Sequence, residues 1–208
     1  MNIRRIGQLW KEHGTFGLIR HAFQKSPIYL SLAYCKDQPT DGCTLPGLLV
    51  EKFSSEQAID SASLIAINSV MGERQFIWLK TLFNRGCELW VGRLDGHVAG
   101  ICWSKCDNVG EKYYLRLTKT DAMILSCMVF PEFRGRGIYP AMLETMVQTM
   151  MGHNNVGRVF IDCKSWNTPS IRGILKAGFY PIGKALRLDL FNRMWILWNS
   201  VPITGNRG

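Results

Sequence analysis

The most strongly patterned part of the chain is a strand-length apolar run followed by a glycine turn and a helical repeat. Residues 123–130 are almost all apolar and suit a buried strand. Pro131 ends this run, because proline has no N–H group to donate to a neighbouring strand. After an Arg-Gly-Arg-Gly stretch at 134–137, apolar residues recur at helical spacing from Ala141 to Val147. The pattern therefore predicts a strand, a tight turn and a helix.

The same periodicities predict further elements on both sides of this unit. A helix capped by Ser54 or Ser55 follows the first predicted strand, and Asp95-Gly96 between two apolar runs predicts a hairpin. Residues 107–120 are polar and predict a loop. The predicted strands are 45–53, 87–94, 97–106, 123–130, 158–164 and those running from 178 to about 198; the predicted helices are 54–71, 73–83, 141–147 and 167–177. Helices interleaved with hairpins indicate a mixed sheet of the α/β class.

The chain is expected to contain one domain, at residues 45–200, with a segment before it (1–44) and a short tail (201–208). Residues 3–24 are basic and amphipathic, which suits a helix packed on the domain or one docked on a membrane surface or partner. Two glycines interrupt this stretch, and we favour packing; contact of residues 3–25 with a membrane surface remains open. Residues 35–44 read as a turn-rich linker.

Composition narrows the class of protein. A chain of 208 residues can form a sizeable core, and 47% apolar with 20% charged residues is an ordinary globular balance. No apolar run approaches the roughly 18 residues of a membrane span, and residues 1–20 lack the features of a secretory signal. Seven cysteines without regular spacing predict neither a disulfide framework nor a metal site. We therefore expect a cytoplasmic protein without a bound metal.

The formal net charge of +9 is concentrated in the second half of the chain. Residues 134–208 contain ten Lys/Arg and three Asp/Glu, which gives +7. This excess favours a multiply charged anion such as a nucleotide cofactor. No nucleic-acid-binding motif accompanies it, so we expect no specific nucleic acid partner.

The glycine turn has the chemistry of an anion site. Gly135 and Gly137 allow a tight turn and leave backbone N–H groups uncovered at the start of a helix, while Arg134 and Arg136 add positive charge. A phosphate or pyrophosphate suits such a turn, although a plain strand-to-helix connection uses the same residues. A dinucleotide fingerprint is absent, because Pro140 stands where a third glycine would be needed. A P-loop is absent, because the chain has no Gly-Lys-Ser/Thr.

Two stretches resemble the GNAT superfamily of N-acetyltransferases. Residues 129–138, with Arg134-Gly135-Arg136-Gly137 at their centre, resemble the acyl-CoA-binding motif Arg/Gln-x-x-Gly-x-Gly/Ala. Tyr139 stands where the family has Gly or Ala. Residues 167–179, Asn167-Thr-Pro-Ser170-Ile-Arg-Gly-Ile174-Leu-Lys176-Ala-Gly178-Phe179, resemble the family's Asn-x-x-Ala/Ser…Lys-x-Gly-Phe helix.

The resemblance implies a fold and a cofactor. The fold would be a mixed, mostly antiparallel sheet flanked by helices, in which the parallel fourth and fifth strands splay apart around the cofactor. The cofactor would be acetyl-CoA or another acyl-CoA. The residues implied to bind it are Met128, Val129, Arg134, Gly135, Arg136, Gly137, Ile138, Tyr139, Asn167 and Ser170. Met128 and Val129 are equally compatible with ordinary core, and Asn167 with a helix N-cap.

The sequence contains no clear signature of the general acid and general base that acetyl transfer would need. The resemblance places the backbone N–H of Met128 against the thioester oxygen, but Ile174 stands where the family often has a tyrosine that protonates the thiolate. Tyr139 and Asp162 are the main catalytic candidates, with Ser126 and Cys127 nearby. A free cysteine in an apolar strand is more often core than an acyl acceptor.

The expected function is transfer of an acetyl group from acetyl-CoA to a primary amine of a small molecule, such as an amino sugar, by direct attack on the thioester. Two alternatives remain open: a GNAT-fold protein that binds acyl-CoA without transferring it, and an acetyltransferase of protein amines. A homodimer also remains open.

Overall fold

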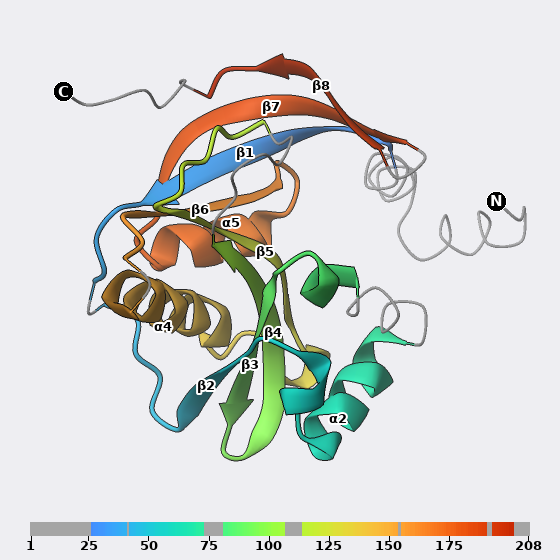
Figure 1. Ribbon diagram of the computed structural model, residues 1–208, viewed down its shortest axis with the longest axis vertical. Coiled ribbons are helices and arrows are strands. Elements are labelled where there is room, and N and C mark those ends of the chain that lie inside the picture. The colour runs from blue at the N-terminus through green and yellow to red at the C-terminus, as the bar shows by residue number, and fades with distance from the viewer. Residues whose placement is uncertain are drawn as a thin grey trace, which may run out of the picture.

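The computed structural model describes residues 26–40, 42–72, 81–106, 114–153, 155–190 and 193–201 (Figure 1). Within these residues the chain forms an eight-stranded sheet of order β2-β3-β4-β5-β6-β1-β7-β8. The strands are β1 (Ile28–Lys36), β2 (Leu48–Phe53), β3 (Glu88–Leu94), β4 (His97–Cys106), β5 (Asp121–Val129), β6 (Arg158–Lys164), β7 (Tyr180–Leu190) and β8 (Arg193–Asn199). The helices are α2 (Ser61–Met71), α4 (Ile138–His153) and α5 (Thr168–Lys176), with short 3-10 turns η1 (Glu56–Ala58) and η2 (Pro131–Phe133).

The sheet is antiparallel except where β5 lies beside β6. Those two strands are parallel, and they correspond to the fourth and fifth strands of the sequence-based prediction. The predicted mixed, mostly antiparallel sheet is therefore confirmed. None of the described helices is both long and apolar enough to cross a membrane.

Strand β1 is not predicted by the sequence pattern. It lies inside the sheet, where it pairs antiparallel with both β6 and β7, so the sheet includes residues ahead of the expected boundary at residue 45. Ser31 is the one polar residue within Ile28–Cys35, and Lys36 is the last residue of the strand; both side chains are buried. Lys36 donates to Glu144 and to the carbonyl oxygen of Ala177. The predicted linker 35–44 is wrong at its start, because residues 35 and 36 belong to β1. The predicted amphipathic stretch 3–24 lies outside the described residues.

The start of α2 also corrects a prediction. Asp60, and not Ser54 or Ser55, caps this helix: its carboxylate accepts from the backbone N–H of Ser63 at 2.9 Å. Ser55 precedes only the short turn η1 and makes no side-chain capping bond. Most of the predicted helix 73–83 and half of the predicted loop 107–120 fall outside the described residues, and the described half of that loop, 114–120, contains no helix or strand. The remaining predicted elements match observed ones within a few residues.

Helices lie on both faces of the sheet (Figure 1), and each face has an apolar core. Helices α4 and α5 cover one face, where side chains such as Met142, Val147 and Ile174 pack on the sheet. Helix α2 covers part of the other face through Ile67, and residues 114–115 cover a further part of that face. The alternation along the strands divides the two cores: Cys102 faces α4, whereas its neighbours Ile101 and Trp103 face α2.

Candidate active site

The sheet opens in its middle, between β5 and β6. Their pairing covers only Asp121–Ile124 with Arg158–Ile161, and the remaining residues of each strand diverge. The paired end is clamped by Arg158, whose Nε and Nη2 donate to the two carboxylate oxygens of buried Asp121 at 2.8 and 2.9 Å. Beyond Ile124, the edge of β5 that faces β6 therefore borders an opening, while its other edge stays paired with β4.

A β-bulge lies on β5 where the opening begins. Trp103 of β4 pairs with Leu125, and Ile101 pairs with Met128, so two residues of β5 oppose the single residue Cys102. One of the two, Ser126, has a φ of 50°, a left-handed value that non-glycine residues seldom adopt. The bulge leaves Ser126 exposed in the middle of the sheet and bends the strand away from β6.

A cleft of about 780 Å³ lies on the α4–α5 side of this opening. We call it the turn cleft, because the glycine turn and the first residues of α4 form one of its walls. Gly135 and Gly137 both have a φ of 79°, and a Cβ at either position would meet no protein atom within 4 Å. Both glycines line the cleft, so backbone N–H groups at the helix N-terminus border a space large enough for a ligand.

The structure brings nine of the ten predicted cofactor residues together in this cleft. They are Met128, Val129, Arg134, Gly135, Gly137, Ile138, Tyr139, Asn167 and Ser170. Arg136 is the exception, because it is not among the lining residues and its guanidinium lies 5.5 Å from the ring centroid of Phe133. Asn167 is also the N-cap of α5, where its side chain accepts from the backbone N–H of Ser170. The expected N-cap therefore lies in the cleft where the cofactor is expected.

Two cations in the cleft are absent from the sequence-based set. Arg172 and Lys176 lie four residues apart on α5, and both line the turn cleft. Their spacing is the signal that could have identified them, since residues i and i+4 share one face of a helix. They add positive charge to the cleft from α5.

A smaller space of about 360 Å³, the central cavity, continues from the turn cleft into the opening between the strands. The two spaces share the lining residues Cys127, Tyr139, Asn167 and Ser170. The central cavity also reaches Ser126 on β5 and Asp162 on β6. It therefore contains every side chain that the sequence suggested for catalysis, apart from Met128, whose expected role belongs to its backbone.

Tyr139 projects its phenol into the central cavity from the first turn of α4. Its ring lies against Gly173 of α5, where a Cβ would overlap it, and its hydroxyl is 3.2 Å from Oγ of Ser170. Burial, and then the neighbouring thiol of Cys127, raises the pKa of Tyr139 well above its ordinary value. Ile174, at the position where the family often has a tyrosine, is fully buried in the core instead.

Asp162 lies on β6 immediately after the last residue paired with β5. Its Oδ2 accepts from Oγ of Ser31 at 2.7 Å, from the hydroxyl of Tyr114 at 2.9 Å and from Nη1 of Arg187 at 2.8 Å. Burial and the charge of Asp162 raise the pKa of Tyr114, which remains a hydrogen-bond donor. Asp162 is thus a structurally anchored carboxylate that still lines a cavity.

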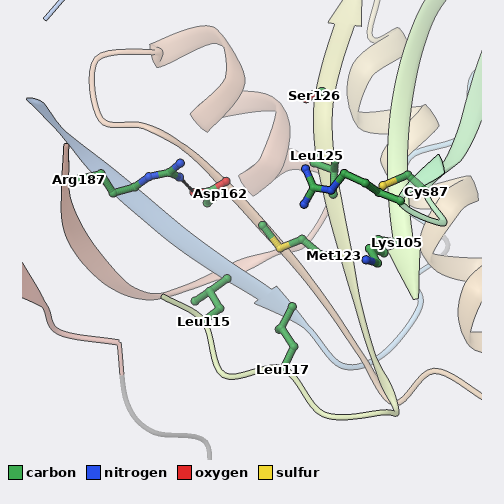
Figure 2. A pocket seen from close by; sticks show the side chains of 10 residues that line it. Cys87, Lys105, Leu115, Leu117, Met123, Leu125, Ser126, Asp162 and Arg187 are labelled. Atoms are coloured by element: carbon green, nitrogen blue, oxygen red, sulfur yellow. Dashed lines mark hydrogen bonds and ion pairs between the residues drawn. The ribbon is translucent and has the colours of Figure 1, made fainter. Parts of the chain in front are cut away.

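A third space lies on the opposite face of the sheet, and Figure 2 shows it from close by. This space, the far cavity, has a volume of about 280 Å³ and shares Leu125, Ser126, Asp162 and Arg187 with the central cavity. Each space shares lining residues with the next, so the three are neighbours in a row across the sheet. The row leads from the glycine turn, past Tyr139 and Asp162, to the other face.

Comparison with known proteins assigns the chain to a family. The chain matches the family model described as "Acetyltransferase (GNAT) family" over residues 57–179, which is more than half of its length. The chain therefore belongs to the GNAT acetyltransferase family. A comparison with curated proteins found no significant match.

Solved structures agree with the fold. The chain is similar to a GCN5-related N-acetyltransferase from Sphaerobacter thermophilus, with a TM-score of 0.55 and 18% identity over 84% of this chain and 56% of that one. It is similar to a GNAT-family acetyltransferase from Colwellia psychrerythraea, with a TM-score of 0.53 and 17% identity over 76% and 54% of the two chains. It is also similar to aminoglycoside acetyltransferase AAC(6')-Ib in complex with coenzyme A, with a TM-score of 0.54 and 13% identity over 73% and 92%. The chain spans little more than half of the first two structures, and likeness at these identities establishes the fold alone.

Proposed function

We propose that this protein transfers an acetyl group from acetyl-CoA to a primary amine of a small molecule by direct attack on the thioester. The observation that supports the proposal is the row of three neighbouring spaces across the sheet, with the glycine turn at one end and a separate cavity at the other. A transferase must admit two substrates from different directions, whereas a protein that only binds acyl-CoA has no need of the second opening.

The turn cleft would hold the cofactor. The N–H groups around Gly135 and Gly137 would bind its pyrophosphate at the start of α4, with Arg134, Arg172 and Lys176 adding positive charge. Asn167 and Ser170 would contact the pantetheine arm in the opening between β5 and β6. The backbone N–H of Met128, just beyond the bulge, would donate to the thioester oxygen, on which negative charge develops during the reaction.

Two side chains of the central cavity would move the protons. The amine nitrogen forms a bond to the thioester carbon, and the carbon–sulfur bond then breaks. Tyr139 would donate its proton to the departing thiolate, and its raised pKa keeps the phenol protonated at neutral pH, as a donor requires. Asp162 would accept the proton that the attacking amine loses, directly or through water. Donors from Ser31, Tyr114 and Arg187 hold its carboxylate at the edge of the cavity.

One observation favours the alternative of binding without transfer. The position that often carries the catalytic tyrosine in this family is the buried aliphatic residue Ile174. If Tyr139 does not supply the missing proton, acyl-CoA would be bound but not consumed.

The deciding experiment measures coenzyme A thiol release from acetyl-CoA across a panel of amino sugars, amino acids, polyamines and peptides, with calorimetric binding of acetyl-CoA in parallel. We expect turnover on at least one small amine. We also expect Tyr139→Phe to lower kcat by roughly 100-fold, which is the usual scale for loss of a general acid. Tyr180→Phe is the matched control, because Tyr180 is exposed and outside all three spaces. Tight binding without turnover on any amine would instead establish the binding protein.

A further inference from the structure

The β8 end of the sheet carries two apolar rows on one face. The rows cross β1, β7 and β8, because residues directly opposite one another in antiparallel strands share a face. The paired residues are Ile28, Leu188 and Trp195 in one row and Leu30, Leu186 and Trp198 in the other. A bulge in β8 lies between the rows, so that Trp195 and Trp198 share this face although they are three residues apart. We call these six side chains the strand patch.

The strand patch is exposed to solvent although it is apolar. Ile28, Trp195 and Trp198 are 47%, 40% and 52% exposed, and the three leucines are half-buried. None of these six described side chains belongs to the apolar cores of the sheet. Leu32, two residues after Leu30, does pack in the core under α4 and α5, so the patch continues that face of the sheet. A contiguous apolar patch with two tryptophans is typical of an interaction surface.

The chain enters the sheet at this patch. The backbone N–H of Asp189 donates to the carbonyl oxygen of Pro27 at 2.8 Å, so residue 27 is already held beside β7. Ile28, the next residue, is itself a member of the patch. The basic, amphipathic stretch 3–24 is therefore attached at the rim of the patch through residues 25–27. Its apolar residues include Ile3, Ile6, Leu9, Trp10, Phe16, Ile19 and Phe23.

Size and attachment favour this stretch over a separate partner. Three neighbouring strands make the patch about 10 Å wide, and its two rows lie about 7 Å apart along the strands. A stretch of the length of residues 3–24 spans about 30 Å even when wound as a helix, which is enough to cover it. A surface joined by a short connection also meets its partner at an effective concentration in the millimolar range. A second copy or a membrane has no such advantage.

We propose that residues 3–24 pack on the strand patch of their own chain through their apolar side chains. The contact would cover both tryptophans and leave the basic residues of the stretch in solvent. This inference does not depend on the proposed transferase function, because none of the six patch residues lines any of the three spaces.

The first test is photo-crosslinking in the whole chain, with the photoreactive p-benzoylphenylalanine in place of Trp195. We expect peptide mass spectrometry to find links from position 195 to residues 3–24 within single chains. The same group in place of Ile65, which is 71% exposed on α2, is the control and should not link to that stretch. Links from position 195 to a second chain, or the absence of any link to residues 3–24, would overturn the inference.

The second test places a charge in the patch. Trp198→Asp should lower Tm by about 4 °C or more, because the carboxylate would be buried under the stretch, whereas Ile65→Asp should change Tm by about 1 °C or less. Equal shifts would contradict a covered patch. Trp198→Asp should leave both the sedimentation velocity and the binding to phosphatidylserine-containing vesicles as in the parent. Dissociation of a dimer would instead identify a second copy as the occupant, and loss of vesicle binding would identify a membrane surface.

Discussion

Replacing Gly137 by aspartate is the sharpest test of where the cofactor binds. Gly137 lines the turn cleft with a φ of 79°, and a Cβ built there meets no protein atom within 4 Å. The protein itself therefore has room for a side chain, and only a ligand in the cleft would collide with it. The aspartate would also place a negative charge beside the N–H groups that are proposed to bind the pyrophosphate.

Two terms contribute to the expected effect. A non-glycine residue in the left-handed region costs about 1–2 kcal/mol in stability, and aspartate is among the residues that tolerate it best. A carboxylate about 4 Å from a phosphate is repelled by about 1 kcal/mol in water and about 4 kcal/mol at the effective dielectric near a protein surface. A value between these limits, about 2.7 kcal/mol, corresponds to a hundredfold loss of affinity for acetyl-CoA.

The assay is calorimetric titration with acetyl-CoA at two ionic strengths, together with the melting temperature. Gly96→Asp is the matched control, because Gly96 has a φ of 83° in the β3–β4 hairpin, has equally open surroundings and lies outside the cleft. Both variants should lose a few degrees of Tm through the backbone term. Only Gly137→Asp should lose acetyl-CoA affinity, and less so at high salt. Near-parental affinity in folded Gly137→Asp protein would refute the reasoning and place the cofactor elsewhere.

Two further predictions concern the core and the proposed acid. Glu144→Ala should lower the free energy of unfolding by about 3–5 kcal/mol in a denaturant titration, because it leaves the buried ammonium of Lys36 without its carboxylate. The control Glu132→Ala, at an exposed site, should change the free energy of unfolding little. Equal effects of the two variants would contradict a structural role for the Lys36–Glu144 ion pair. The raised pKa of Tyr139 means that its phenol keeps its proton as pH rises past 10, so the absorbance difference between parent and Tyr139→Phe at 295 nm should show no phenolate below that pH. A phenolate signal near pH 9 would contradict the burial of the phenol in the central cavity.

Much of the local structure follows from the sequence alone. The strand ended by Pro131, the turn with Gly135 and Gly137, and the Asp95-Gly96 hairpin were all predictable, because each depends on side-chain periodicity or on backbone conformations available to few residues. The motif around the glycine turn also identified the family, and most of the residues drawn from it line one cleft. A local motif is sufficient there because strand end, turn and helix start are contiguous in the chain.

Other features depend on contacts between segments that are distant in the sequence, and only the tertiary structure decided them. Strand β1 lies between β6 and β7, which follow it by more than a hundred residues, and its buried Lys36 pairs with Glu144; no local pattern encodes these pairings. The bulge at Ser126 depends on the register between β4 and β5, and the opening beside it on where the pairing of β5 with β6 ends.

The far cavity shows the same limit most clearly. Arg85, Lys105 and Arg187 belong to three separate segments, and each alone reads as an ordinary surface charge. Only the folded sheet places them around one space beside Asp162. The sequence by itself thus determined the family and the glycine turn, whereas the lining of the far cavity depends on long-range packing, because that packing alone sets which side chains face one another.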